Sequence, residues 1–168
     1  MFFLNKDVDD ATSSVPILSH ELNGHKSRVS QLRFSPSVDN LLVSGSSDNT
    51  VKLWDIETSS SILSINDGIK EIPNDIQWNL EGSLLACSYQ KEAKVKLYDP
   101  RQQKAISEFQ AHSGVKGTFI SFMEGSKLMT VGFSKSSGGK SSRNLSLWDI
   151  DTGLSSPLAS KVVAENNF

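Results

Sequence analysis

Val51-Lys52-Leu53-Trp54-Asp55 decides the fold, because two further versions of this stretch follow in the same chain. They are Val95-Lys96-Leu97-Tyr98-Asp99 and Leu145-Ser146-Leu147-Trp148-Asp149. The aromatic residues at their fourth positions are 44 and then 50 residues apart. A repeat of this length that ends in Trp-Asp is typical of the four-stranded blade of a β-propeller. The pattern therefore predicts an all-β chain, a partial β-propeller of about three four-stranded antiparallel WD-repeat blades.

Alternating apolar residues between turn signals predict four strands in each repeat. We expect them at 29–34, 41–46, 51–54 and 61–65 in the first repeat, and at 75–78, 84–89, 94–98 and 105–109 in the second. The third repeat has them at 118–122, 128–133 and 144–148, with a weaker signal at 158–163. The blades then span about 24–66, 67–110 and 111–163.

Three segments lie outside this regular pattern. Residues 1–14 are expected to form a disordered N-terminal segment, followed by an incomplete propeller over 15–168. Within it, residues 15–22 resemble the outer strand of a preceding blade. Glycine, serine and lysine dominate residues 134–142, which predicts a solvated, mobile loop in the last blade.

The composition favours a cytoplasmic protein without a nucleic-acid partner. The formal net charge is −2 and the pI is about 5.9, so the basic excess of nucleic-acid binders is missing. No stretch approaches the roughly 20 apolar residues of a transmembrane segment, and acidic residues follow the first four residues too closely for a signal peptide. Cys87 is the single cysteine, which fits a reducing compartment, and its apolar neighbours predict a small buried residue.

The first repeat carries the polar residues of a WD-repeat blade. In such blades a histidine before the first strand, a hydroxyl on the second, an aspartate in the next turn and the tryptophan of the third form a buried hydrogen-bond chain. His25, Ser44 (or Ser46), Asp48 and Trp54 match this structural tetrad. Buried polar groups have to be paired, and a paired set fixes one geometry.

The second repeat matches the tetrad only in part. The spacing of the first repeat, applied to Tyr98, puts Glu92 at the acidic position and Ser88 at the hydroxyl position. No histidine precedes the first strand of this repeat. We therefore expect an incomplete tetrad in the second blade.

The third repeat has His112 and Trp148. Alignment through Gly132 places Val131 at the hydroxyl position and Lys135 at the acidic position. A valine cannot accept a hydrogen bond and a lysine cannot replace a carboxylate. We therefore expect the tetrad of the third blade to be broken.

Catalysis and cofactor binding are not expected. His25 and Asp48 could form part of a nucleophilic triad, but no Gly-x-Ser-x-Gly elbow accompanies them and the repeat explains both residues. Three histidines and one cysteine lack the spacing of a zinc site. Gly138-Gly139 lacks the strand and helix that flank a phosphate-binding loop.

The chain resembles the coronin family in several motifs. Tyr98-Asp99-Pro100-Arg101 resembles the Asp-Pro-Arg that ends a coronin blade, and Thr130-Val131-Gly132-Phe133-Ser134-Lys135 resembles the Thr-Gly-Phe-Ser stretch of the next one. Gly24-His25-Lys26-Ser27-Arg28-Val29 and Asn40-Leu41-Leu42-Val43-Ser44 fit the preceding coronin blade. The tail at 153–160 is more similar to tandem-propeller coronins than to short ones.

The resemblance implies a seven-bladed propeller that binds actin filaments or, in tandem members, works in membrane traffic. The chain matches about three middle blades, so we expect a fragment, a truncated gene model or one part of a split propeller. The family's actin-contacting arginine lies in an early blade that is not matched. Blades left without neighbours expose apolar faces, which predicts self-association.

We therefore expect a non-catalytic, cytoskeleton-associated scaffold whose partners are proteins, with actin filaments implied by the resemblance. The candidate partner surface consists of cationic residues before the first strands and in the turns between second and third strands: Lys26, Arg28, Lys91, Lys135, Lys140 and Arg143. Such a surface suits an acidic partner. The alternative is a generic WD-repeat adaptor of a ubiquitin-ligase or trafficking complex.

Overall fold

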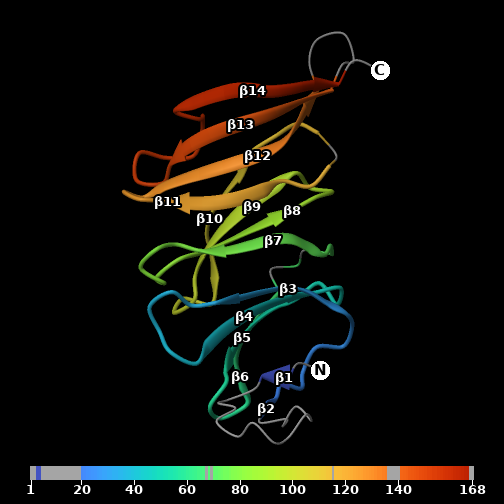
Figure 1. Ribbon diagram of the computed structural model, residues 1–168, viewed down its shortest axis with the longest axis vertical. Coiled ribbons are helices and arrows are strands. Elements are labelled where there is room, and N and C mark those ends of the chain that lie inside the picture. Colours follow the sequence, from blue (N-terminus) through green and yellow to red (C-terminus); the bar gives the residue numbers. More distant parts are fainter. Residues whose placement is uncertain are drawn as a thin grey trace, which may run out of the picture.

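The structure is a computed structural model and describes residues 3–4, 20–66, 68, 70–114, 116–135 and 141–166. Across these residues it has three four-stranded antiparallel sheets and one two-stranded sheet, with no helix among them. The three large sheets lie side by side in chain order along the long axis (Figure 1). The prediction of an all-β chain with three four-stranded blades is confirmed.

Each blade is built from four consecutive strands, and each strand pairs with the next one in sequence. Blade 1 contains β3 (Val29–Phe34), β4 (Leu41–Ser46), β5 (Val51–Asp55) and β6 (Ser60–Ile65). Blade 2 contains β7 (Pro73–Trp78), β8 (Leu85–Tyr89), β9 (Lys94–Asp99) and β10 (Lys104–Gln110). Blade 3 contains β11 (Phe119–Met123), β12 (Lys127–Lys135), β13 (Ser141–Asp149) and β14 (Ala159–Asn166).

The register of the middle strands repeats from blade to blade. Leu42 lies opposite Trp54 in blade 1, Leu85 opposite Tyr98 in blade 2 and Leu128 opposite Trp148 in blade 3. Each of these six side chains is at most 3% exposed. Because side chains alternate between the two faces of a strand, the shared register presents equivalent residues on the same face of every blade.

The hydrophobic core lies between the blades. One buried cluster joins residues of blade 1 with residues of blade 2, including Val43, Leu53, Ile76 and Tyr98. A second cluster joins blade 2 with blade 3 and contains Leu97 and Trp148, among others. Neighbouring sheets therefore cover the apolar faces that they turn toward each other, which is how a propeller excludes water between its blades.

Polar side chains on the first strands also connect the three blades. The Gln31 side-chain amide donates to the Asn74 carbonyl at 2.9 Å, and the Asn74 side-chain amide donates to the Thr118 carbonyl at 2.8 Å. One residue from each blade thus contributes to a single chain of hydrogen bonds.

A second connection centres on Asp75, which is 5% exposed on β7. Its Oδ2 accepts the backbone N–H of Ile120 in blade 3 at 3.0 Å, and its Oδ1 lies 3.5 Å from Nη2 of Arg33 in blade 1. Blade 2 is therefore held to both neighbours by one carboxylate.

Two segments differ from the sequence prediction. Phe3 and Leu4, inside the segment expected to be disordered, form β1 (Phe3–Leu4), which pairs with β2 (His20–Glu21). The mobile loop predicted at 134–142 was too long, because β12 continues to Lys135 and β13 begins at Ser141. Residues 5–19 and 136–140, to which the remainder of these predictions refers, lie outside the described residues.

Candidate functional site

The tetrad residues of blade 1 form one continuous hydrogen-bond chain. Trp54 Nε1–H donates to Ser44 Oγ at 2.7 Å, and Ser44 Oγ lies 2.6 Å from His25 Nε2. His25 Nδ1 lies 2.9 Å from Asp48 Oδ2. A neutral histidine with its proton on Nδ1 satisfies this order, because Ser44 O–H can then donate to Nε2 while Nδ1–H donates to Asp48. These hydrogen bonds thus tie the loop before β3 to β4 and β5. We call the loop before the first strand of each blade its opening loop.

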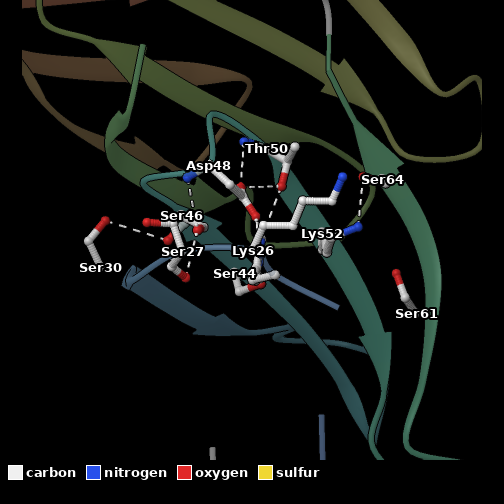
Figure 2. Close-up of polar contacts among 12 residues, drawn as sticks. Lys26, Ser27, Ser30, Ser44, Ser46, Asp48, Thr50, Lys52, Ser61 and Ser64 are labelled. Carbon is white, nitrogen blue, oxygen red and sulfur yellow. Dashed lines mark hydrogen bonds and ion pairs between the residues drawn. The ribbon is translucent and has the colours of Figure 1, made fainter. Parts of the chain in front are cut away.

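Asp48 also holds the turn between β4 and β5 together. Its Oδ1 accepts from the Thr50 hydroxyl at 2.6 Å and the Thr50 N–H at 3.0 Å, and its Oδ2 accepts the Lys26 N–H at 2.8 Å (Figure 2). Burial by itself raises the pKa of Asp48, but these hydrogen bonds and the one from His25 outweigh it and hold the pKa far below its ordinary value. Ser46 has a different role, since its hydroxyl accepts the Asp48 N–H at 3.1 Å.

The side chains of this hydrogen-bond chain in blade 1 are buried and paired. Burial lowers the pKa of His25, although Asp48 acts in the opposite direction. The His25 and Asp48 side chains are 5% and 9% exposed, and Ser44 is fully buried. Ser44 and Asp48 each bind His25, so the polar groups of all three side chains are paired within the blade.

Blade 2 also ties its opening loop to the turn between its second and third strands, but here the acceptor lies in the loop and the donors lie in the turn. The Glu71 carboxylate, in the opening loop and 5% exposed, accepts the Lys91 N–H at 2.8 Å and the Glu92 N–H at 3.3 Å. In blade 1 the acid lies in the turn and accepts from the opening loop. Burial raises the pKa of Glu71 and the turn amides partly offset that effect. The repeat motif does not predict Glu71, because a WD-repeat blade has a histidine in this loop.

The other residues assigned to the second tetrad do not form one. Glu92 was placed at the acidic position, but its contribution is the backbone N–H that binds Glu71. The Ser88 hydroxyl donates to the Thr118 carbonyl of blade 3 at 2.6 Å. Tyr98 Oη lies 3.4 Å from Tyr89 Oη. Ser88 therefore links two blades, where a tetrad hydroxyl would bind inside its own blade.

Blade 3 has the histidine, the hydroxyl and the tryptophan of the tetrad joined by hydrogen bonds. The prediction that this tetrad lacks its hydroxyl was therefore wrong. Trp148 Nε1–H donates to Thr130 Oγ1 at 2.9 Å, and Thr130 Oγ1 lies 2.9 Å from His112 Nε2. Thr130 is fully buried, and burial lowers the pKa of His112.

The alignment failed at Gly132 because that glycine has a packing role of its own. A Cβ added to Gly132 would lie 2.5 Å from His112 Cδ2, so the imidazole occupies the space that a side chain would need. Ser44 lies two residues after Leu42, which is opposite Trp54. Thr130 likewise lies two residues after Leu128, which is opposite Trp148, so Thr130 corresponds to Ser44. Lys135, assigned to the acidic position, instead ends β12, where its backbone N–H donates to Ser113 Oγ at 3.1 Å.

The aspartate that ends each repeat forms the next turn. Asp55 Oδ1 accepts the Glu57 N–H at 2.9 Å, and Asp149 Oδ1 accepts the Asp151 N–H at 3.0 Å. Asp99 binds Arg101 through its backbone N–H and guanidinium, which lowers the pKa of Asp99 to about 2. These short side chains bind amides two residues ahead, as expected for Asx turns.

The described members of the candidate partner surface share one end of the blades. Lys26 and Arg28 precede β3, Lys91 follows β8, Lys135 ends β12 and Arg143 lies near the start of β13. All five are exposed. In antiparallel sheets the start of the first strand and the turn between the second and third strands lie at the same end. Lys140 lies outside the described residues.

Two absences apply to the described part of the chain alone. It contains no group of three histidine, cysteine or acidic side chains placed to hold a metal ion. No helix in it has the length and apolar character needed to cross a bilayer.

Comparison with known proteins identifies the repeats and their relatives. A family profile described as "WD domain, G-beta repeat" matches residues 17–55. Coronin-like protein crn1 of Schizosaccharomyces pombe is 33% identical over 139 residues, which cover 82% of this chain and 22% of that protein. Human Coronin-2A is 30% identical over 153 residues, 88% of this chain and 28% of that protein.

A solved structure, the WD40 domain from Toxoplasma gondii coronin, has the same fold. It superposes with a TM-score of 0.81 at 24% identity, over 90% of this chain and 38% of that one. The chain spans less than a third of each curated relative named above. The sequence relatives, the profile match and the three four-stranded blades agree, and the chain is a coronin-like WD-repeat protein.

Proposed function

We propose that this chain is a non-catalytic scaffold that binds actin filaments and helps to organise the actin cytoskeleton in the cytoplasm. The cationic end of the blades carries this proposal. Lys26, Arg28, Lys91, Lys135 and Arg143 all lie at that end of a chain whose net charge is −2. Positive charge gathered on one surface of an acidic protein steers it toward an acidic partner, and the likeness to coronins makes the actin filament the expected one.

Co-sedimentation of the full chain with actin filaments tests the proposal. We expect pelleting at low salt and less pelleting at about 0.15 M salt, because screening weakens exposed charge pairs. Lys26→Gln combined with Arg28→Gln should reduce pelleting at both salts. The matched control is Lys104→Gln, which removes an exposed lysine at the opposite end of blade 2. Absence of pelleting at either salt would refute actin binding by this chain.

A second candidate is a peptide-binding adaptor, and one cavity favours it. A cavity of about 310 Å³ lies between the β4–β5 turn and the opening loop of blade 2. Asn49, Lys70, Ile72 and Lys91 contribute to its walls, and Ile72 is 45% exposed. A peptide with an acidic and an aliphatic side chain would match this lining. Lys70→Gln should then weaken peptide binding and leave filament pelleting unchanged, because Lys70 lines the cavity and is not part of the proposed actin-binding surface.

We also propose that the chain self-associates through the face of blade 3 that is turned away from blade 2. Val131 lies opposite both Phe119 and Leu145 on this face, and Phe119 is 64% exposed. The residues at the place of Leu145 in the other blades, Val51 and Val95, are at most 1% exposed, because the next blade covers them. Size-exclusion chromatography with light scattering should give a mass above that of a monomer, and Phe119→Ser should restore the monomer. A cooperatively melting monomer before substitution would contradict this proposal.

A further inference from the structure

The hairpin formed by β12 and β13 is longer than its counterparts in the other blades. β4 and β8 each end four residues after the leucine opposite the blade aromatic residue, whereas β12 ends seven residues after Leu128. Three extra residues per strand lengthen the hairpin by roughly 10 Å at the usual rise. We call residues 133–135 and 141–143 the hairpin arm, which extends from blade 3 at the upper right of Figure 1.

One aromatic ring in the hairpin arm holds two cations. Lys116 Nζ lies 4.5 Å from the centroid of the Phe133 ring, and Arg143 Cζ lies 5.0 Å from it. The two cationic centres are therefore at most about 9.5 Å apart, the sum of these distances. Lys135 is two residues from Phe133 along β12, so it belongs to the same face of the sheet. The face of an aromatic ring attracts cations, which keeps these long side chains in place.

The opening loop of blade 3 is fixed to the hairpin arm. Gly114 N–H donates to the Phe133 carbonyl at 2.7 Å, and Lys135 N–H donates to Ser113 Oγ at 3.1 Å. A Cβ on Gly114 would collide with the Phe133 backbone, so the loop approaches as closely as a glycine allows. Lys116, which comes from this loop, is thus held against the hairpin arm by backbone contacts.

The positive charge of this cluster is not neutralised within the described residues. Among the ion pairs found there, none involves Lys116, Lys135 or Arg143, and all three side chains are exposed. The Phe133 ring adds an apolar surface between the cations, whereas Val131 and Leu145, which belong to the proposed self-association face, lie outside residues 133–135 and 141–143. The hairpin arm therefore presents cations around one apolar ring.

We propose that the hairpin arm is a docking site for an acidic protein segment in which apolar residues accompany the acidic ones. The proposal rests on the proposed function, since Lys135 and Arg143 belong to the surface invoked there, and it adds Lys116 and Phe133. A nucleic acid fits less well, because a phosphate backbone requires an extended basic surface and this chain has a net charge of −2.

Fluorescence anisotropy on the full chain tests the proposal with a fluorescein-labelled peptide of the repeat Glu-Glu-Leu. We expect saturable, salt-sensitive binding that Lys116→Gln with Arg143→Gln weakens by roughly tenfold. Phe133→Leu keeps both charges and the apolar bulk, yet should weaken binding by about two- to fivefold, because the cations lose their common ring. Lys104→Gln removes a charge at the opposite end of blade 2 and should leave the affinity unchanged.

Several results would overturn the proposal. They are no saturable binding, an equal loss in Lys104→Gln and in Arg143→Gln, or tighter binding of a single-stranded oligothymidylate than of the peptide. An unchanged affinity in Phe133→Leu would overturn the role of the ring. If the peptide binds as expected while actin filaments fail to pellet the chain, the docking site stands and the actin proposal falls. If the peptide does not bind the unmodified chain, while actin filaments pellet Lys116→Gln/Arg143→Gln as well as the unmodified chain, the docking site falls and the actin proposal stands.

Discussion

Replacing Thr130 by valine removes one hydroxyl from the centre of blade 3 and keeps the shape of the side chain. That hydroxyl accepts from Trp148 Nε1–H and contacts His112 Nε2, each at 2.9 Å, and Thr130 is fully buried. Valine would leave a buried indole N–H and a buried imidazole nitrogen without this partner. Each such loss costs about 1–3 kcal/mol. We therefore expect Thr130→Val to lower the free energy of unfolding by about 3 kcal/mol.

Thr130→Ser is the matched control. Serine retains the hydroxyl and loses one buried methyl group, which costs about 1 kcal/mol including the small cavity. Urea unfolding followed by circular dichroism measures both variants. With a slope of about 1–3 kcal/mol per molar urea, Thr130→Val should lower the midpoint by about 1–3 M and Thr130→Ser by about a third of that. If valine is tolerated as well as serine, the hydrogen bonds at Thr130 contribute little and our account of the blade is refuted.

Three further predictions concern buried ionisable groups. Burial lowers the pKa of His25 and His112, so below about pH 6.5 the unfolded chain takes up protons that the folded chain excludes. The free energy of unfolding should therefore fall as the pH drops from about 7 to 5.5. In urea titrations His25→Gln/His112→Gln should make it depend less on pH. The raised pKa of Glu71 has the opposite effect at lower pH, because the folded chain then binds the proton more readily than the unfolded chain. Glu71→Ala should cost about 1–3 kcal/mol and speed hydrogen exchange of the two turn amides it binds, and unchanged exchange would argue against the reversed connection in blade 2. Asp75→Asn keeps the size of the side chain and removes its charge. It should lower the free energy of unfolding by about 2 kcal/mol, because one carboxylate oxygen that binds a neighbouring blade becomes a donor. An unaltered melting temperature would show that the contact is dispensable.

The strand order could be predicted from the sequence because local signals agree at each strand. Alternating apolar residues, turn residues and a regular aromatic ending gave all twelve blade strands in the right order. The polar chain of blade 1 could be anticipated in the same way, since its residues match their expected positions in sequence. These features depend on short-range spacing, which a single sequence contains.

The polar connections of blades 2 and 3 depend on contacts that spacing does not record. Thr130 was overlooked because a glycine one residue out of step, Gly132, served as the alignment anchor. Glu71 was not predicted because its partners are backbone amides, which nearly every residue has, so no residue type marks them in the sequence. Asp75 binds residues more than forty positions away in both directions, and no local pattern marks such a role.

The reversed connection in blade 2 bears on how such repeats diverge. A tie between a loop and a turn requires one acceptor facing one donor, and either side can supply the acceptor, as Glu71 and Asp48 demonstrate. Mutation can therefore erase the familiar letters of a repeat while its geometry survives. A profile built on those letters detects residues 17–55, although the chain folds into three blades. Counting sequence motifs will accordingly underestimate the number of blades in divergent propellers. The register of strand pairing gives a more reliable count of the blades.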